Sequence, residues 1–276
     1  MQEVMIKRAS ELLADGTVVR VLGWKNGEFA YDPTPAVFNS ADELSAFVYN
    51  DFCASNLSKY LIDLCKKDGK TLVFLKPCDS YSFNQLLTEH RVDREKVHII
   101  GLECTGKLDE AKLRDNGCEG ILSVKTEGDT VTVETLYGEK TLAKAECIGE
   151  RCTVCKSRKV VAYDEMIGEN GEVNSECGRF DQVAALEAMT PDERYEFWRG
   201  ELSRCIRCNA CRNICPACSC ENCVFDTRSP VYLRRLLLIH LKKTCSISSV
   251  HSTLQADVLT AASAQEYVRS RSRCTC

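Results

Sequence analysis

The alternation of apolar and polar positions predicts an α/β domain in the first half of the chain. Continuous apolar runs, typical of strands buried on both faces, lie at 71–75 and 97–102, and a β-branched run, TVVRVLGW, lies at 17–24. Amphipathic segments that predict helices lie at 6–14, 57–67, 82–89 and 109–114. Strands that alternate with helices at this spacing favour a mostly parallel sheet with crossover helices.

The pattern changes after this alternation. Between 120 and 142 the apolar period becomes two, as in TVTVETLYGEKTL, which predicts an insertion of antiparallel β-hairpins. The segment 156–189 has a weak pattern and is interpreted as a connector. Thr190 and Pro191, followed by two acids, predict the start of a helix that leads to Cys205.

Composition and charge are those of a folded protein and exclude some classes of partner. The chain has 276 residues, of which 44% are apolar and 28% charged. Its net charge of −4 argues against a nucleic-acid-binding protein, which needs a basic face. The apolar stretch 232–241 is too short for a membrane span and contains two arginines. Because the first residues carry acids and lack an apolar segment, we expect no signal peptide and a cytoplasmic location.

Cysteine is the unusual residue. The chain contains 19, and clustered thiols in a reducing compartment are typical of metal or redox sites. Four of them form the run C-x2-C-x2-C-x3-C-P of bacterial ferredoxins, at Cys205, Cys208, Cys211 and Cys215. This run predicts a ferredoxin-like module that holds a 4Fe–4S cluster. The alternative is a zinc ribbon with ligands Cys205, Cys208, Cys220 and Cys223.

A second, dispersed set of cysteines lies in the α/β part. Cys78 and Cys104 each follow an expected strand, so parallel pairing would bring both to one edge of the sheet. Cys147, Cys152 and Cys155 form a compact C-x4-C-x2-C loop, whose spacing also resembles that of plant-type 2Fe–2S proteins, so nuclearity stays open. The remaining cysteines of this part are interpreted as packing or isolated thiols: Cys53, Cys65, Cys118 and Cys177.

Several segments carry a resemblance to a known family. The segments KPCDSYSFNQLL, VHIIGLECTG and GERCTVCKSRKVVAYDEMIG resemble the beta-subunit family of coenzyme F420 hydrogenases and formate dehydrogenases. The stretches NDFCASNLSKYL and FWRGELSRCIRCNACRNICPACSCENCVFD are similar to a subgroup in which that domain is fused to a two-cluster ferredoxin module. The resemblance covers most of residues 1–226.

The resemblance implies a ligand set and a function. One 4Fe–4S cluster would be held by Cys78, Cys104, Cys152 and Cys155, with Cys147 as a competitor. The family relays electrons between iron–sulfur clusters and a flavin or deazaflavin partner, within a complex of several subunits. FAD is a candidate cofactor, but no GxGxxG or P-loop is present, and the segment 55–59 is no more than a candidate for a phosphate-facing helix start.

The end of the chain departs from the family. A second ferredoxin run is expected after about residue 227 but is absent. Read one base out of frame, codons of this segment permit such a run, because Val258, Ala261, Ala264 and Val268 have the spacing of the missing cysteines. Chance agreement is on the order of one in a thousand per register. We therefore interpret 227–276 as an irregular, out-of-frame tail; the alternative is a native disordered or partner-bound tail, and the nucleotide sequence of the gene decides between them.

Three domains and a ranked set of functions follow. The predicted domains are 1–178 (α/β), 179–226 (a helix and half of a two-cluster module) and the tail 227–276. Without the second run, the fourth ligand of the ferredoxin-type cluster would come from Cys215, Cys218, Cys220 or Cys223. Together with the cluster of the α/β domain, we expect one to two 4Fe–4S clusters in this chain. The favoured function is an electron-transfer subunit of a hydrogenase, formate dehydrogenase or heterodisulfide reductase type of complex. The alternatives are a flavin-dependent oxidoreductase subunit in its own right and a zinc-stabilised binding module. No catalytic residue is identified.

Overall fold

The structure is a computed structural model that describes residues 1–29, 31–174 and 176–206. The chain divides into two compact units, Met1–Cys177 and Gly178–Cys276. Part of the predicted ferredoxin-like module and the whole irregular tail lie outside the described residues, including these predicted or substitute ligands: Cys208, Cys211, Cys215, Cys218, Cys220 and Cys223.

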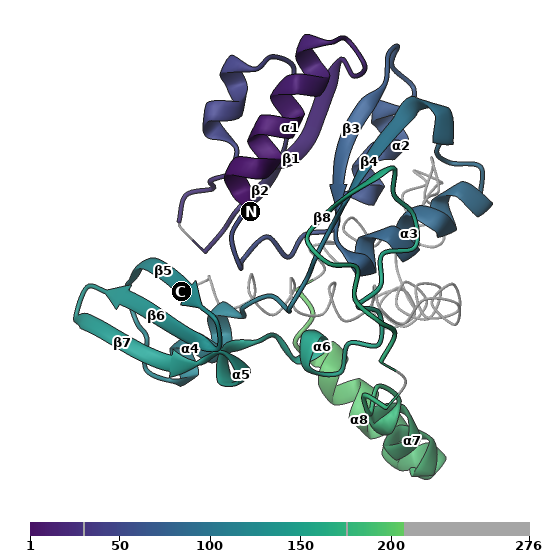
Figure 1. Cartoon of the computed structure of the whole chain (residues 1–276). Coiled ribbons are helices and arrows are strands. Elements are labelled where there is room, and N and C mark those ends of the chain that lie inside the picture. The colour runs from purple at the N-terminus through teal and green to yellow at the C-terminus, as the bar shows by residue number, and fades with distance from the viewer. Residues whose placement is uncertain (30, 175, 207–276) are drawn as a thin grey trace, which may run out of the picture. The chain divides into compact units, whose positions relative to one another are not determined.

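The first unit is built on a five-stranded sheet (Figure 1). Its order is β2-β1-β3-β4-β8, and the strands are β1 (Arg20–Lys25), β2 (Thr34–Phe38), β3 (Thr71–Leu75), β4 (Val97–Leu102) and β8 (Glu165–Ile167). Three of the four neighbouring pairs are parallel, and only the edge strand β2 runs antiparallel to β1. The predicted mostly parallel α/β sheet is therefore confirmed. Every residue of β3 is buried, which explains its unbroken apolar sequence.

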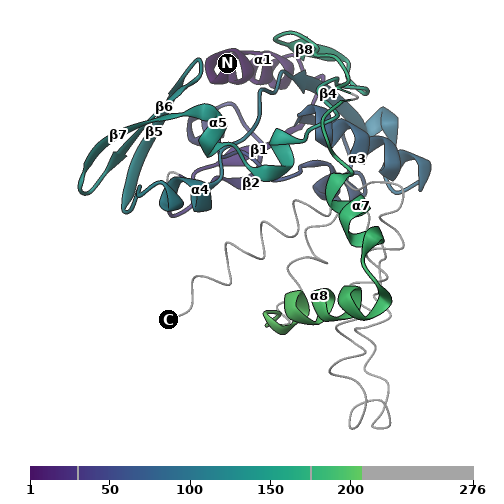
Figure 2. The same cartoon turned by 90° about the horizontal axis from the view of Figure 1, so that it is seen from below.

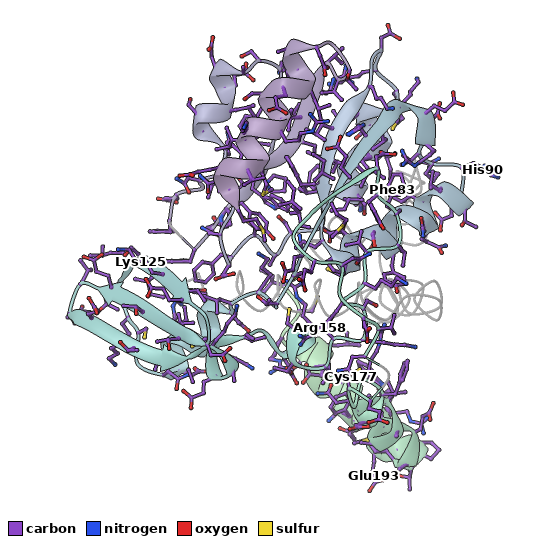
Figure 3. All side chains as sticks on the ribbon, viewed as in Figure 1. Phe83, His90, Lys125, Arg158, Cys177 and Glu193 are labelled. Atoms are coloured by element: carbon purple, nitrogen blue, oxygen red, sulfur yellow. The ribbon has the colours of Figure 1, made fainter. Side chains whose placement is uncertain are left out.

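Helices and short turns complete the core of this sheet. Helix α1 (Gln2–Ala14) buries Met5, Ala9 and Leu12, whose spacing places them on one helical face. Helix α3 (Pro77–Thr88) connects β3 to β4 and buries Phe83 and Leu86; Figure 3 labels Phe83. Four short helical elements lie between residues 42 and 96: η1 (Asp42–Ala46), η2 (Ser58–Tyr60), α2 (Leu61–Leu64) and η3 (Arg94–Lys96).

The expected hairpins form a separate antiparallel sheet (Figure 2). Its strands are β5 (Ile121–Glu127), β6 (Thr130–Thr135) and β7 (Gly138–Ala143). A small second core forms beneath it, from Val131, Val133, Leu113, Cys118 and Cys147 among others. This core includes residues of α4 (Glu110–Asp115) and α5 (Lys144–Cys147), and α6 (Glu150–Thr153) follows.

The structure corrects several expected elements. The helix expected at 57–67 is reduced to η2 and α2, and the helix expected to begin at Ser82 begins at Pro77. Proline at the first helical position has the backbone angle that a helix needs, and the polar residues after it concealed the start. The segment interpreted as a connector contains β8 and α7 (Asp181–Ala188).

The second unit begins with α7 and α8 (Pro191–Ser203). The helix predicted at Thr190 is confirmed: the hydroxyl of Thr190 accepts a hydrogen bond from the amide of Glu193, whose carboxylate in turn accepts from the amide of Thr190. The guanidinium of Arg194 donates to carbonyl oxygens at the end of α7, which connects the two helices. Among the described residues, no helix has the length and apolar character needed to cross a membrane.

Ion pairs hold the short edge strand β8 in place. The carboxylate of Glu165 accepts hydrogen bonds from Arg8 at 2.7 Å and lies 3.0 Å from the His98 ring, and Asp164 pairs with Arg94. The Arg8 hydrogen bond is the main cause of a lowered pKa at Glu165. The pKa of Asp164 is also lowered, because its bonds to Arg94 and to the Ile99 amide outweigh the effect of burial.

These carboxylates predict a loss of stability in acid. A lowered pKa means that the folded state binds fewer protons than the unfolded chain, so the stabilisation is complete above about pH 4 and disappears as the pH falls through the folded pKa. At pH values below that point, we expect the urea concentration at the unfolding midpoint of the apo chain to decrease. The decrease should be less steep in Glu165→Gln. An equally steep acid limb in that variant would contradict the assignment.

Candidate metal centre

Two of the predicted ligands lie at equivalent positions after neighbouring strands. In the parallel pair of β3 and β4, Leu75 lies opposite Gly101. Cys78 follows Leu75 by three residues, and Cys104 follows Gly101 by three residues. Both cysteines are half-buried. The structure therefore places them at the carboxyl edge of the sheet, where α/β folds form their binding sites.

Cys78 also lies in the first turn of a helix. It is the second residue of α3, directly after Pro77. The unpaired amides and the helix dipole at such an end favour a thiolate and other negative groups. Burial raises the pKa of the Cys78 thiol well above its usual value, and the neighbouring carboxylate of Asp79 and thiol of Cys104 raise it further.

A distant loop is held next to the residues that follow Cys104. The amide of Gly149 donates to the carbonyl of Lys107 at 2.9 Å, and Leu108 and Ile148 form an isolated antiparallel bridge. Within the loop, the amide of Cys152 donates to the carbonyl of Gly149 at 2.8 Å. These backbone bonds carry the predicted C-x2-C pair to the sheet edge.

Electrostatic effects on two thiols connect Cys104 with Cys78 and with the C-x2-C pair. Burial is the main cause of a raised pKa at Cys155, and the thiols of Cys152 and Cys104 add to it. Because Cys104 also raises the pKa of Cys78, it links the helix start to the distant loop. The chain after Cys155 returns to α3, where the amide of Val161 donates to the hydroxyl of Ser80 at 3.1 Å.

Cys147 points elsewhere. It ends α5 and is fully buried in the small core beneath the three-stranded sheet. Its pKa is raised by burial and then by the neighbouring thiol of Cys118, which lies in the same core. The structure therefore separates the predicted competitor from Cys78, Cys104, Cys152 and Cys155.

The described residues do not assemble a site for a single metal ion. Within the described ranges, no group of three or more His, Cys, Asp or Glu side chains could hold a metal ion. A tetrahedral zinc site needs four ligand atoms close around one centre. A 4Fe–4S cluster instead takes one thiolate at each of its four iron atoms, so its ligands would stand farther apart. Four neighbouring thiols from three chain segments are compatible with that arrangement.

The ferredoxin-type run is described only at its first residue. Cys205 follows α8 in the second unit and is half-buried, and its amide donates to the carbonyl of Leu202 at 3.1 Å. The other three cysteines of the run lie outside the described residues. The ligand role of this run stays a prediction.

A buried ion pair lies directly beside Cys78 and was not recognised in the sequence. The ammonium of Lys76 lies 2.7 Å from the carboxylate of Asp79, and both side chains are 1% exposed. It also donates to the carbonyl of Ser55 at 2.9 Å and lies 4.6 Å from the centre of the Trp24 ring. Burial acts to lower the pKa of Lys76, but the charge and hydrogen bond of Asp79, together with smaller effects of Cys78 and Tyr49, outweigh it, so the pKa is raised. The only signal in the sequence is the segment KPCD.

The candidate phosphate-facing segment 55–59 does not form an open helix start. Its only helical part is the three-residue turn η2. The hydroxyl of Ser55 accepts from the indole of Trp24 at 2.8 Å, and the Asn56 side chain accepts from the amide and hydroxyl of Ser58 and donates to Ser82. These groups are used in hydrogen bonds inside the protein, and a phosphate-binding role for the segment stays a prediction.

Comparisons with known proteins identify relatives of the chain. No protein-family model matches it. It is 24% identical to the F420-dependent formate dehydrogenase subunit beta of Methanocaldococcus jannaschii, over 84% of this chain and 78% of that protein. It is 23% identical to the F420-dependent formate dehydrogenase 1 subunit beta of Methanococcus maripaludis, over 77% of this chain and 70% of that protein. The resemblance predicted from the cysteine segments is therefore confirmed for the beta-subunit family, but not for the fused ferredoxin part.

A solved structure shares the fold. A chain of the F420-reducing NiFe hydrogenase complex from Methanosarcina barkeri, determined with xenon derivatization, matches with a TM-score of 0.50 and 13% identity. The match covers 72% of this chain and 84% of that chain. At this identity the similarity concerns the fold alone, and it agrees with the mixed α/β architecture described above.

Proposed function

We propose that the chain is an electron-transfer subunit of a coenzyme F420-dependent oxidoreductase complex. The observation that carries this proposal is that Cys78 and Cys104 follow the ends of two neighbouring parallel strands, while backbone bonds hold the loop with Cys152 and Cys155 beside the segment that follows Cys104. The relatives support it, because each is named as a subunit of an F420-dependent formate dehydrogenase. The expected partners are therefore other subunits of such a complex and a flavin or deazaflavin coenzyme.

The chain's own residues would hold and orient the cluster. A 4Fe–4S cluster, when bound, supplies one-electron chemistry at a potential that the protein sets. Cys78 would bind it from the positive end of α3, and Cys104 from the end of β4. Cys152 and Cys155 would bind it from the loop that Lys107 and Leu108 hold in place. The ferredoxin-type run from Cys205 to Cys215 would bind a second cluster.

Anaerobic reconstitution with iron and sulfide tests the proposal. We expect acid-labile sulfide, a broad brown absorbance and at least one 4Fe–4S cluster per chain. A variant with Cys205, Cys208 and Cys211 changed to serine should retain one cluster. A preparation that contains zinc, is colourless and lacks sulfide would contradict the proposal and favour the zinc-stabilised module. A yellow flavin, such as FAD, that remains on the purified chain would favour the flavin-dependent alternative.

A further inference from the structure

The carboxylate of Asp79 contacts the sulfur of the implied ligand Cys78. Its oxygen Oδ1 accepts a hydrogen bond from the Cys78 thiol, with 3.6 Å between oxygen and sulfur. Its other oxygen, Oδ2, lies 2.7 Å from the ammonium nitrogen of Lys76. Lys76 directly precedes α3, and Cys78 and Asp79 are the second and third residues of that helix. The ligand therefore lies in one turn of chain with two opposite charges, and the negative charge touches its sulfur.

The surroundings fix the carboxylate in this position. The side chains of Asp79 and Lys76 are both 1% exposed, so solvent screens their charges little. The ammonium of Lys76 is itself held by the carbonyl of Ser55 at 2.9 Å and by the face of the Trp24 ring. Moving the carboxylate away from this ammonium would leave two unpaired charges inside the protein, which is costly. Asp79 is therefore held against Cys78 by its own ion pair.

Stability alone does not account for two charges at this place. Two apolar residues of similar volume would fill the same space without taking an ion pair out of water. Of the two charges, the carboxylate acts more strongly on the ligand, because Asp79 raises the pKa of the Cys78 thiol more than Lys76 lowers it. The pair therefore gives Cys78 a surplus of negative charge beside its sulfur, although the pair as a whole is neutral.

We propose that Asp79 sets the reduction potential of the dispersed four-cysteine site: its carboxylate, held against Cys78 by Lys76, lowers the potential of the bound cluster. This inference rests on the proposed function. A 4Fe–4S cluster with four thiolates carries a net negative charge that becomes more negative on reduction. A fixed negative charge beside a ligand sulfur, in a poorly screened environment, destabilises the reduced form more than the oxidised form. The ammonium of Lys76 opposes this effect only in part.

The test uses the full chain with Cys205, Cys208 and Cys211 changed to serine, reconstituted anaerobically so that one cluster is observed. The midpoint potential is measured at one pH by redox titration followed by electron paramagnetic resonance. We expect Asp79→Asn to raise the potential, because it removes the negative charge and keeps an oxygen that Lys76 can bind. The matched control is Asp63→Asn, in the exposed ion pair of the same sequence separation, which should leave the potential unchanged.

A second variant separates charge from hydrogen bonding. The side-chain amide of asparagine could donate to the sulfur and raise the potential by that route, whereas leucine cannot donate a hydrogen bond. Lys76→Met combined with Asp79→Leu removes both charges and leaves neither buried without its partner. We expect its potential to rise as well, but by less than in Asp79→Asn, where the ammonium of Lys76 remains.

Each outcome has a definite meaning. An unchanged or lowered potential in cluster-loaded Asp79→Asn would overturn this inference alone. A rise in Asp79→Asn without a rise in the double variant would assign the effect to the asparagine amide and would also overturn it. If neither variant holds a cluster while the triple-serine chain does, the ion pair acts in assembly of the site and the inference fails. The absence of a cluster in the triple-serine chain itself would overturn the proposed function.

Discussion

Replacing Lys76 by methionine is expected to destabilise the first unit by about 3–5 kcal/mol. The substitution keeps the apolar stem but leaves the carboxylate of Asp79, which is 1% exposed, without its ammonium partner. It also removes the bond to the Ser55 carbonyl and the contact with the Trp24 ring. Urea unfolding of the apo chain, followed by circular dichroism under reducing conditions, measures the change.

Two further variants show whether burial causes the effect. Lys66 and Asp63 form an ion pair with the same sequence separation at 3.1 Å, but their side chains are 58% and 83% exposed. Lys66→Met should therefore cost less than about 1 kcal/mol. The double variant Lys76→Met with Asp79→Leu, which removes both buried charges, should recover most of the stability lost in the single variant. Equal losses at Lys66 and Lys76 would contradict the interpretation.

Cysteine-to-serine substitutions should divide the cysteines of the first unit into two classes. In the chain whose ferredoxin-type run is removed, Cys104→Ser should abolish cluster binding, because Cys104 is an electrostatic neighbour of both Cys78 and Cys155. Cys147→Ser should retain the cluster, because Cys147 is buried in the small second core. Iron and sulfide analysis per chain after anaerobic reconstitution measures both results.

The same pair of variants has distinct costs in stability. Cys147→Ser puts a hydroxyl into an apolar core, so we expect it to lower the apo melting temperature without changing the iron content. Cys104 is half-buried, so its substitution should cost less stability while removing the cluster. The opposite pattern, with iron lost in Cys147→Ser and kept in Cys104→Ser, would refute the ligand assignment.

The elements that the sequence predicted well are those whose signal is local. The strands at 71–75 and 97–102 are unbroken apolar runs because both faces of these strands are buried. The start of α8 follows from Thr190 and Pro191, which act within one helical turn. The hairpins at 120–142 have a period of two that any antiparallel sheet with one buried face imposes.

The elements that the sequence missed depend on distant partners. β8 has only three residues and no apolar run, and it exists because it pairs with β4 and because Glu165 binds Arg8 and His98. The edge strand β2 contains a proline and pairs only with β1. α7 has a weak amphipathic pattern, and none of its residues is fully buried.

The sequence by itself determined the residue type of the candidate ligands, their spacing within each segment and the sheet edge at which two of them lie. Those properties are local, because they depend on neighbouring residues and on the direction of parallel strands. Only the tertiary structure showed that Cys147 is buried in the small second core, and that a buried ion pair of Lys76 and Asp79 flanks Cys78. Burial and charge pairing depend on residues far apart in the chain, and no local pattern specifies them.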